Sequence, residues 1–171
     1  MSSPTKINLG GGQHKKPGFA TIDILQIPEV DIVADLEKGI PLPDNAVEEI
    51  IALSILEHLS DTVFIMEEIY RVCKNNAVLT ITVPYAKSSA AFKDPTHKKF
   101  FVEKTFDYFD QDFTKGKRLP DYNLKCNFKV QKISYKYYTP WFKDVPGIHR
   151  FFARFLWDII KTMTVELRVI K

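Results

Sequence analysis

Three consecutive glycines and two aspartates follow short apolar segments in the first part of the chain. Gly10, Gly11 and Gly12 come after the first segment, Asp23 lies near the end of the second, and Asp35 ends the third. Because glycine has no side chain, a ligand can approach such a turn closely. An acid ending a second strand can accept hydrogen bonds from two ribose hydroxyls, and one after a third strand can accept from an adenine amino group. In this order the residues predict an adenosine site at the carboxyl ends of parallel strands.

The chain has four histidines, and histidine is the side chain best matched to proton transfer near neutral pH. His97 closes the run Asp94-Pro95-Thr96-His97, where we expect a substrate to lie, so it is the first candidate base. Asp94 could orient the imidazole or share a metal ion with it, or the two could only pin a long loop. His58 is the second candidate, although it could equally cap a helix. We expect His14 in the glycine loop and His149 at a helix start.

The sequence gives little support for a metal centre or a disulfide. Its two cysteines, Cys73 and Cys126, are too few for a disulfide framework or a structural zinc site. We expect both to be reduced and Cys73 to lie in the core. No spacing of Cys and His fits zinc, and one Asp with one His makes a thin case for magnesium or manganese. We therefore predict no resident metal ion.

Short β-branched runs bounded by turn residues predict the strands that would position these side chains. The first four strands are expected at residues 6–9, 19–24, 31–35 and 49–54. A helix should follow from Ser60 or Asp61, with its apolar residues on one face, and end at Asn75-Asn76. The apolar run 77–83 is typical of a strand buried on both faces. Strand, helix and strand in this order imply a right-handed parallel crossover in an α/β sheet.

The second half of the chain is less regular. Residues 84–127 are aromatic and charged, with a short helix expected at 105–109. A strand at 128–136, a helix at 148–161 and a strand at 165–170 should complete the fold. The apolar stripe Phe151–Trp157 of that helix is expected to pack on the sheet rather than touch a membrane surface.

Composition excludes several classes of protein. With 45% hydrophobic and 26% charged residues, the 171-residue chain is globular rather than disordered. No apolar run approaches the roughly 18 residues of a transmembrane helix. The N-terminus lacks the apolar core of a signal peptide, so we expect a reducing, cytoplasmic location. The net charge of +3 joins an acidic stretch at 1–60 to a basic one at 87–171, where the lysines could bind an anion or only solvate the surface.

Lysines and aromatic residues alternate around His97. The lysines are Lys87, Lys93, Lys98, Lys99 and Lys104, and the aromatic residues are Phe92, Phe100, Phe101, Phe106 and Tyr108. Aromatic faces stack on sugar rings or bases, and lysines attract phosphate or carboxylate groups. The pattern predicts an anionic or sugar-containing acceptor, such as a nucleotide-sugar or an acidic glycan. RNA would also fit, and we favour it less.

Several motifs together resemble the class I S-adenosylmethionine-dependent methyltransferases. The runs INLGGG, GFATIDI, DIVADLEKGIPLPDNAVEEIIALSILEHL and FIMEEIYRVCKNNAVLTITVP carry this resemblance over about residues 6–84. The chain is most similar to a small branch with a truncated first crossover, often found among glycan-modifying enzymes. The block DPTHKKFFVEKTFDYF at 94–109 resembles members that act on sugars, and the terminal VELRVIK resembles the last strand of the family.

The resemblance implies a Rossmann-like sheet of seven strands, mostly parallel with an antiparallel last strand, flanked by helices. It implies one domain, 1–171, with a cofactor-binding half (1–84), a substrate loop region (85–127) and C-terminal strands with a helix (128–171). It also implies S-adenosylmethionine as the cofactor. Its implied contacts are Gly10, Gly11 and Gly12 at the methionine part, Asp23 at the ribose, Ile24, Asp35 and Leu36 at the adenine, and Ser54 beneath the cofactor.

Two features depart from the family pattern. His14 stands where a third glycine is usual, and only six residues, Gln13 to Gly18, separate Gly12 from Phe19. A parallel crossover normally needs about a dozen residues or more. The usual first helix therefore cannot fit, which leaves the sheet less covered. This could weaken cofactor binding or leave room for a partner subunit, as in a homodimer.

These observations lead to three functional hypotheses. The first is an S-adenosylmethionine-dependent O-methyltransferase that acts on a sugar hydroxyl of a glycan or glycan precursor, with His97 as the base. The second keeps methyl transfer but changes the acceptor to RNA or a nitrogen nucleophile, for which strong salt dependence of binding would be the sign. The third is a non-catalytic, methyltransferase-like binding module.

Overall fold

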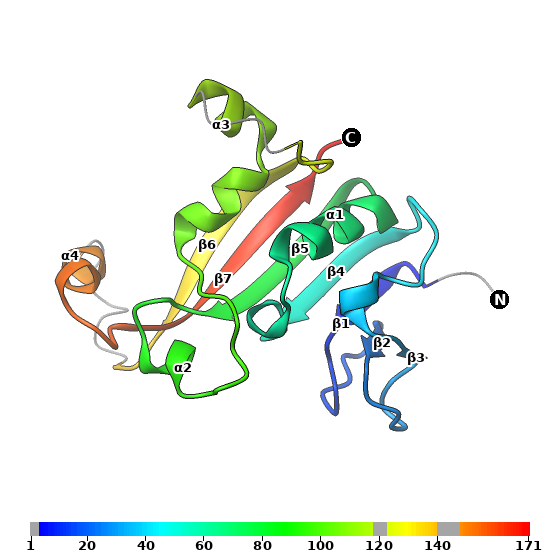
Figure 1. Ribbon diagram of the computed structural model, residues 1–171, viewed down its shortest axis with the longest axis horizontal. Coiled ribbons are helices and arrows are strands. Elements are labelled where there is room, and N and C mark those ends of the chain that lie inside the picture. The colour runs from blue at the N-terminus through cyan, green and yellow to red at the C-terminus, as the bar shows by residue number, and fades with distance from the viewer. Residues whose placement is uncertain (1–3, 118–122, 140–147) are drawn as a thin grey trace.

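The computed structural model describes residues 4–117, 123–139 and 148–171, and these form a seven-stranded sheet of order β3-β2-β1-β4-β5-β7-β6 (Figure 1). The strands are β1 (Lys6–Leu9), β2 (Ala20–Asp23), β3 (Ile32–Val33), β4 (Val47–Leu53), β5 (Cys73–Pro84), β6 (Phe128–Tyr137) and β7 (Ile160–Val169). The first five strands pair in parallel, whereas β7 runs antiparallel to both β5 and β6. The predicted Rossmann-like α/β sheet with an antiparallel last strand is confirmed.

The helices are short. The α-helices are α1 (Thr62–Val72), α2 (Ser89–Phe92), α3 (Gln111–Gly116) and α4 (Ile148–Phe155), and the 3-10 helices are η1 (Leu36–Lys38), η2 (Leu56–His58) and η3 (Glu103–Phe109). Asp61 caps α1 as predicted, because its side chain accepts a hydrogen bond from the Phe64 N–H. The short helix expected at 105–109 is confirmed as part of η3. The segment 84–127 is more regular than expected, since α2 and α3 also lie in it; its residues 118–122 lie outside the described part.

Two predicted helix ends are wrong. The first helix ends at Val72 instead of Asn75, because Cys73 is already extended and begins β5. Asn76 does have a positive φ of 64°, but it lies within β5, between Cys73 and Val78, where the pairing with β4 shifts register. The helix expected at 148–161 ends at Phe155. Strand β7 then begins at Ile160, where pairing with β5 and β6 outweighs the helical period.

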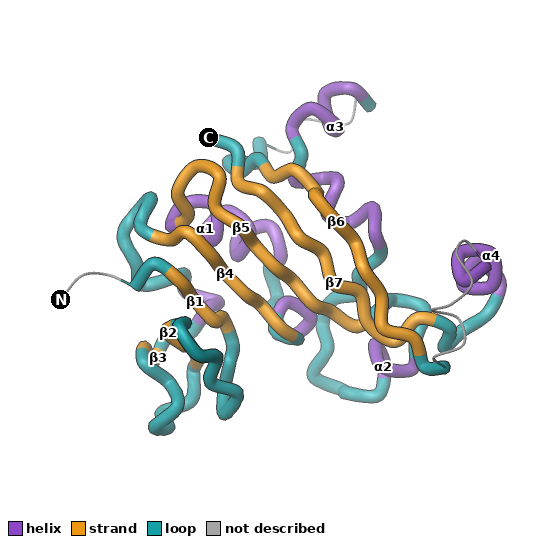
Figure 2. Tube along the Cα trace, turned by 180° about the vertical axis from the view of Figure 1, so that it is seen from behind, coloured by secondary structure: helices purple, strands orange, loops and turns teal. Residues whose placement is uncertain are grey.

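Helices cover one face of the sheet. Figure 1 shows α1 and η3 in front of the strands, and their buried side chains join those of the sheet in one core. Figure 2 shows the opposite face of β4–β7, which no helix of the described residues covers. The prediction that 77–83 is buried on both faces is therefore wrong: Leu79 and Ile81 are fully buried, whereas Thr80 and Thr82 are only partly so.

The short first crossover that the sequence predicts contributes to this, as does the β2–β3 connection, which also has no helix. Residues 10–19 form a loop with no helix, and this loop covers only the β1–β2 part of the open face. Under it, the buried Asn8 side chain donates a hydrogen bond to the carbonyl of His14 at 3.0 Å. Where the family pattern would place a helix, this chain therefore has a short loop that a buried amide helps to hold.

The C-terminal helix does not pack as predicted. Phe151 and Phe155 of α4 are 63% and 64% exposed, because α4 lies beyond the edge of the sheet (Figure 1). The expectation that its apolar stripe packs on the sheet is confirmed only for Ala153, which is buried in the core, and Phe152, which packs against it. No helix in the described ranges is both long enough and apolar enough to cross a bilayer.

Candidate functional site

The glycine turn and Asp23 lie together at the ends of β1 and β2, as the sequence predicts. The Asp23 carboxylate accepts hydrogen bonds from the backbone N–H groups of Gly12 at 2.8 Å and Leu25 at 3.0 Å. Asp23 is only 8% exposed. A carboxylate has about four acceptor sites, so these two bonds leave capacity for the hydroxyls of a ligand. Asp23 thus holds the turn and keeps a charged acceptor beside it.

The turn has one closed side and one open side. A Cβ atom at Gly10, whose φ is +63°, would lie 2.3 Å from Ile55, and one at Gly11 would lie 2.1 Å from the Asn8 amide. At Gly12, with φ of +48°, the nearest atom would be 3.8 Å away, on Asp23. The backbone at Gly12 is therefore the part of the turn that a ligand can approach without displacing a side chain.

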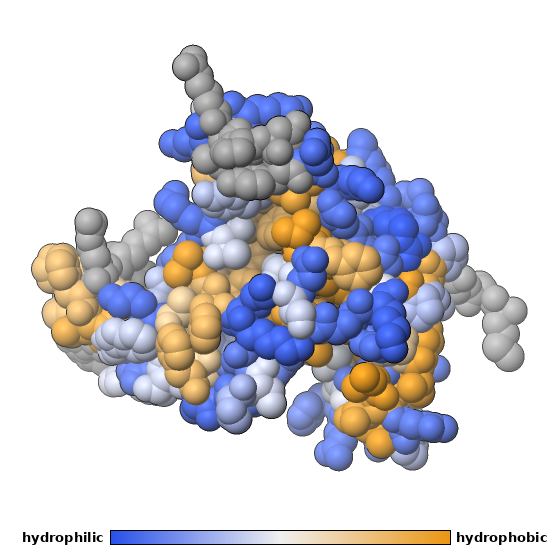
Figure 3. Space-filling view, in the orientation of Figure 1, coloured by the Kyte–Doolittle hydropathy of each residue, from blue (hydrophilic) through white to orange (hydrophobic). Residues whose placement is uncertain are grey.

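Apolar side chains next to Asp23 are exposed. Ile24, Leu25 and Val33 are 65%, 47% and 54% exposed, and Figure 3 shows apolar residues gathered over the β2–β3 segment. Such a surface suits the flat face of a base. Ile24 therefore lies where the sequence places it, next to Asp23 and open to solvent.

The other predicted contact residues have structural partners. Asp35 caps η1 by accepting from the Glu37 N–H at 3.1 Å, and it pairs with Lys38 at 3.2 Å. The Leu36 side chain is buried in the core, so only its backbone could face an adenine. Ser54 ends β4 with a positive φ of 54°, is exposed, and donates its N–H to the Thr82 carbonyl.

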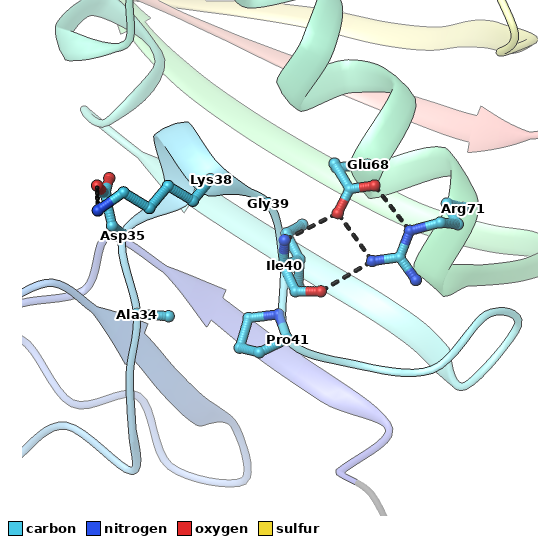
Figure 4. Close-up of a pocket in the computed structure, with 8 residues that line it drawn as sticks. All are labelled: Ala34, Asp35, Lys38, Gly39, Ile40, Pro41, Glu68 and Arg71. Carbon is cyan, nitrogen blue, oxygen red and sulfur yellow. Dashed lines mark hydrogen bonds and ion pairs between the residues drawn. The ribbon is translucent and has the colours of Figure 1, made fainter.

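A pocket of about 330 Å³ lies elsewhere, between η1 and α1 (Figure 4). Arg71 holds its rim by pairing with Glu68 at 2.7 Å and donating to the Ile40 carbonyl at 2.8 Å. Its full lining is Ala34, Asp35, Lys38, Gly39, Ile40, Pro41, Glu68 and Arg71. Asp35 alone among the predicted site residues lines this pocket, so the pocket is distinct from the glycine turn and from the candidate bases.

The candidate catalytic histidines are brought together by two segments. Helix η2 carries His58, and the loop after α2 carries His97; their ring centroids are 4.8 Å apart in an edge-to-face arrangement. The backbone N–H groups of Lys98 and Lys99 both donate to the Glu57 carbonyl, which fixes the loop against η2. His14, by contrast, is exposed in the glycine loop, and the side chain of His149 lies outside the described residues.

Hydrogen bonds set the protonated nitrogen of each ring. His97 Nδ1 lies 2.8 Å from the Ala91 carbonyl, which can only accept, so Nδ1 carries a proton and, in the neutral ring, Nε2 has the lone pair. His58 Nδ1 lies 2.9 Å from the Thr96 hydroxyl, which itself donates to Asp94 at 2.7 Å. His58 therefore also donates from Nδ1 and keeps Nε2 free. Asp94 thus orients His58 through Thr96, and its other oxygen is 4.0 Å from His97 Nε2.

Sequence reasoning missed Glu57. This residue is 1% exposed, and neither of its carboxylate oxygens has a hydrogen-bond partner among the described residues. Burial raises the pKa of Glu57, while its own backbone N–H, His58, His97 and the nearby Ser54 side chain act in the opposite direction. Potential ligand atoms of Glu57, His58 and His97 all lie within 4.8 Å of one another. The signal was an acid directly before a candidate histidine, but only the fold shows that this acid is buried.

Exposed aromatic rings lie next to these histidines. Phe92 stacks on Phe100 with ring centroids 4.5 Å apart, and Trp157 lies 5.5 Å from Phe92. All three side chains are about half exposed. Phe92 directly follows Ala91, whose carbonyl holds His97, and Figure 3 shows apolar side chains gathered over α2. By contrast, Phe101 and Phe106 belong to the core.

Comparisons with known proteins agree with this architecture. Residues 12–81 match a family described as a methyltransferase domain. A search of curated proteins finds no match. Among solved structures, a SAM-dependent methyltransferase from Archaeoglobus fulgidus is 17% identical, with a TM-score of 0.63 over 95% of this chain and 85% of that one. A possible histamine N-methyltransferase from Thermotoga maritima is 13% identical, with a TM-score of 0.61 over 100% and 84%.

The same fold also serves another reaction. The [4+2]-cyclase SpnF is 13% identical to this chain, with a TM-score of 0.59 over 96% of this chain and 74% of that one. Likeness at this level of identity concerns the fold, and the site must carry the argument about chemistry. The strand order, the antiparallel β7 and the domain match together show that this chain has the Rossmann-like methyltransferase fold.

Proposed function

We propose that this chain is an S-adenosylmethionine-dependent methyltransferase that methylates a sugar hydroxyl of a glycan or glycan precursor. The observation that carries the proposal is the buried Asp23 carboxylate beside the open backbone of Gly12, at adjacent parallel strand ends. The names of the similar structures and the methyltransferase domain match over 12–81 support the choice of cofactor.

The proposed cofactor site follows the strand ends. Asp23 would accept hydrogen bonds from the ribose hydroxyls, and the turn at Gly12 would lie beside the methionine part. The exposed Ile24 would contact the adenine, which Asp35 and the backbone of Leu36 would face from the next strand. Ser54 would lie beneath the cofactor at the end of β4. The first helix that this chain lacks would carry none of these residues, so its absence leaves all the proposed cofactor contacts in the chain.

The proposed reaction is an in-line displacement. The acceptor oxygen attacks the methyl carbon, the new O–CH₃ bond forms as the S–CH₃ bond breaks, and the sulfonium becomes the neutral thioether of S-adenosylhomocysteine. The acceptor hydroxyl must also lose its proton. In the metal-free protein, Nε2 of His97 is the candidate to take that proton, with His58 beside it. Positioning the two reactants supplies much of the rate.

The aromatic group at Phe92, Phe100 and Trp157 supports a sugar acceptor. Its exposed rings can stack on the apolar face of a sugar, and it lies one residue from the carbonyl that holds His97. Lys93 and Lys99 flank Phe92 and Phe100 in sequence and would attract a phosphate or carboxylate on the acceptor. An RNA base could use the same rings, and a nitrogen acceptor would need only orientation and desolvation.

Calorimetric titration with S-adenosylmethionine and S-adenosylhomocysteine tests the cofactor site. We expect Asp23→Asn to weaken binding by about 10-fold or more, because one neutral amide oxygen replaces a charged double acceptor. Asp31→Asn is the matched control, since Asp31 also accepts a backbone N–H, from Thr21, but lies outside the site. If wild type and Asp23→Asn bind the cofactor with equal affinity, or if folded wild type does not bind it, the proposed cofactor site is rejected. The alternative of a non-catalytic binding module would then remain.

Transfer of a labelled methyl group then identifies the acceptor. Sugars, nucleotide-sugars, RNA and amines would be screened with the same protein, with His97→Ala as the catalytic variant. If proton removal limits the rate, His97→Ala should lower turnover by about 100-fold or more and leave cofactor affinity unchanged. If RNA or an amine is methylated and no sugar is, the proposed acceptor is wrong, whereas the proposed methyl-transfer reaction is supported.

A further inference from the structure

We propose that Glu57, His58 and His97 form a binding site for a first-row divalent metal ion. The three side chains come from η2 and from the loop after α2, and potential ligand atoms of all three lie within 4.8 Å of one another. Two imidazoles and one carboxylate are a common ligand set for such ions. The sequence alone predicts no metal, because Glu57 does not stand out there as a buried acid.

The surroundings of the two histidines match those of metal ligands. A histidine that binds a metal through one nitrogen almost always donates its other ring N–H to a carbonyl, a carboxylate or a similar group. His97 donates from Nδ1 to the Ala91 carbonyl at 2.8 Å. His58 donates from Nδ1 to Thr96, which is in turn held by Asp94. In the neutral form of each ring, Nε2 is therefore the nitrogen that carries the lone pair, and neither Nε2 has a partner in the described hydrogen bonds.

Glu57 provides a second, independent observation. Burying a carboxylate without a hydrogen bond or an opposite charge is costly, so such groups are rare unless a partner is supplied. Glu57 is 1% exposed, and both oxygens lack a hydrogen-bond partner in the described structure. A divalent cation bound by Glu57 and the two imidazoles would satisfy the buried carboxylate and one nitrogen of each ring together.

The dimensions allow binding with a small closure. Ligands of a first-row ion lie about 2.0–2.2 Å from it, which brings them to roughly 3–3.5 Å from one another. The loop that carries His97 has to move inward by about the difference between these two spacings, and its residue Thr96 is exposed. Asp94, 4.0 Å from His97 Nε2, is placed to add a fourth ligand oxygen.

The site lies directly after β4, next to Ser54, at the sheet edge where we place the methyl donor. The mechanistic part of the inference therefore rests on the proposed function. A cation there would bind the acceptor oxygen and lower the pKa of its hydroxyl. In the metal-bound protein, His97 then serves as a ligand, and the acceptor proton leaves to solvent. Metal binding itself is independent of the cofactor and can be tested without it.

The experiment measures metal binding to the full chain after EDTA treatment and removal of the chelator, with no S-adenosylmethionine present. Free Mn²⁺ is followed by its paramagnetic resonance signal, and Co²⁺ by its visible absorption. We expect one equivalent to bind and to raise Tm, because an ion that binds only the folded state stabilises it. Mg²⁺ and Ca²⁺, which prefer all-oxygen sites, should bind more weakly.

Matched variants locate the site. Glu57→Gln and His97→Gln should abolish Mn²⁺ and Co²⁺ binding and the metal-dependent rise in Tm. Glu166→Gln on β7 and His14→Gln in the glycine loop change the same residue types at a distance and should bind as wild type. Thr96→Val alters an exposed residue that links Asp94 to His58 and is not itself a proposed ligand, so the variant should fold normally and bind about 10-fold to 100-fold more weakly.

Two results would overturn the inference. One is folded wild-type protein that binds none of Mn²⁺, Co²⁺ or Zn²⁺ at millimolar concentration. The other is binding that persists unchanged in both Glu57→Gln and Thr96→Val, which would place the ion elsewhere. Neither result bears on cofactor binding, which the calorimetric titration with Asp23→Asn measures separately.

Discussion

At the scale of single residues, the glycine turn shows how one position can meet two separate constraints. Gly10 has a φ of +63°, and its missing side chain also leaves room for Ile55, 2.3 Å from an ideal Cβ. Gly18 has a similar φ of +80° but faces open space. The two glycines therefore share the backbone constraint, and only Gly10 carries the packing constraint.

We expect Gly18→Ala to lower the free energy of unfolding by about 1–2 kcal/mol, the cost of a left-handed conformation for a residue with a Cβ. Gly10→Ala should cost clearly more, because the β1 turn or Ile55 must also move. Urea unfolding of the two variants and the wild type measures both values. Equal losses in the free energy of unfolding would mean that Ile55 can move at no energetic cost and that the turn is not tightly packed.

Residue types alone predict part of the candidate site. Asp23, Gly12 and His97 can be picked out because each has a chemical role that few other residues fill, and the structure brings Asp23 and Gly12 into contact. Glu57 could not be picked out, because an acidic side chain is usually exposed. Its burial depends on the loop that Lys98 and Lys99 anchor to its carbonyl, a contact between segments far apart in sequence.

At the scale of elements, one ion-pair group fixes the β3–β4 connection to α1. Arg71 of α1 donates to the carbonyls of Ile40 and Leu42 and pairs with Glu68, and Glu68 accepts the Ile40 N–H (Figure 4). The hydrogen bond from Arg71, with that from the Ile40 N–H, holds the pKa of Glu68 below its ordinary value. The charged form of Glu68 therefore stabilises the fold.

The sign of the pH dependence follows. A carboxyl with a lowered pKa contributes stability above its unfolded pKa of about 4.3, and this is lost as pH falls through the folded value. Glu68→Gln should cost about 1–3 kcal/mol at pH 7, and the gap to wild type should narrow between pH 5 and pH 3. Urea unfolding across this range measures the gap.

Glu166→Gln, on the open face, is the control and should stay within about 0.5 kcal/mol of wild type at pH 7. A gap for Glu68→Gln that does not change with pH would contradict this account.

Elements with a strong period could be predicted from the sequence, and their ends could not. The apolar face of α1 and the β-branched runs of the parallel strands each carry a local signal. The change from α1 to β5 at Cys73 has no such signal, because it is set by pairing with Val47 of β4. The end of α4 is similar: Asp158 turns the chain with a φ of +56° and binds Ser89 of α2, a contact that only the assembled fold supplies.

At the scale of the whole molecule, the sheet is covered by helices on one face and open on the other. On β5 and β7, the covered face presents the buried Ile81 and Val165, which are paired across the strands. The open face presents Thr80 opposite Glu166, and Thr82 hydrogen-bonded to Thr164 at 2.8 Å. These side chains are suited to water, because antiparallel strands with one solvated face alternate apolar and polar residues.

Neighbouring substitutions on β5 test this division. Ile81→Ala removes a fully buried side chain and should lower the free energy of unfolding by about 2–5 kcal/mol. Thr80→Ala, one residue away and facing the other side, should cost less than about 1 kcal/mol, the range of strand propensity. Urea unfolding measures both, and sedimentation at several protein concentrations shows whether the chain associates. If Thr80→Ala costs as much as Ile81→Ala, and more at high protein concentration, then a second copy covers the open face, where the short first crossover has left no helix.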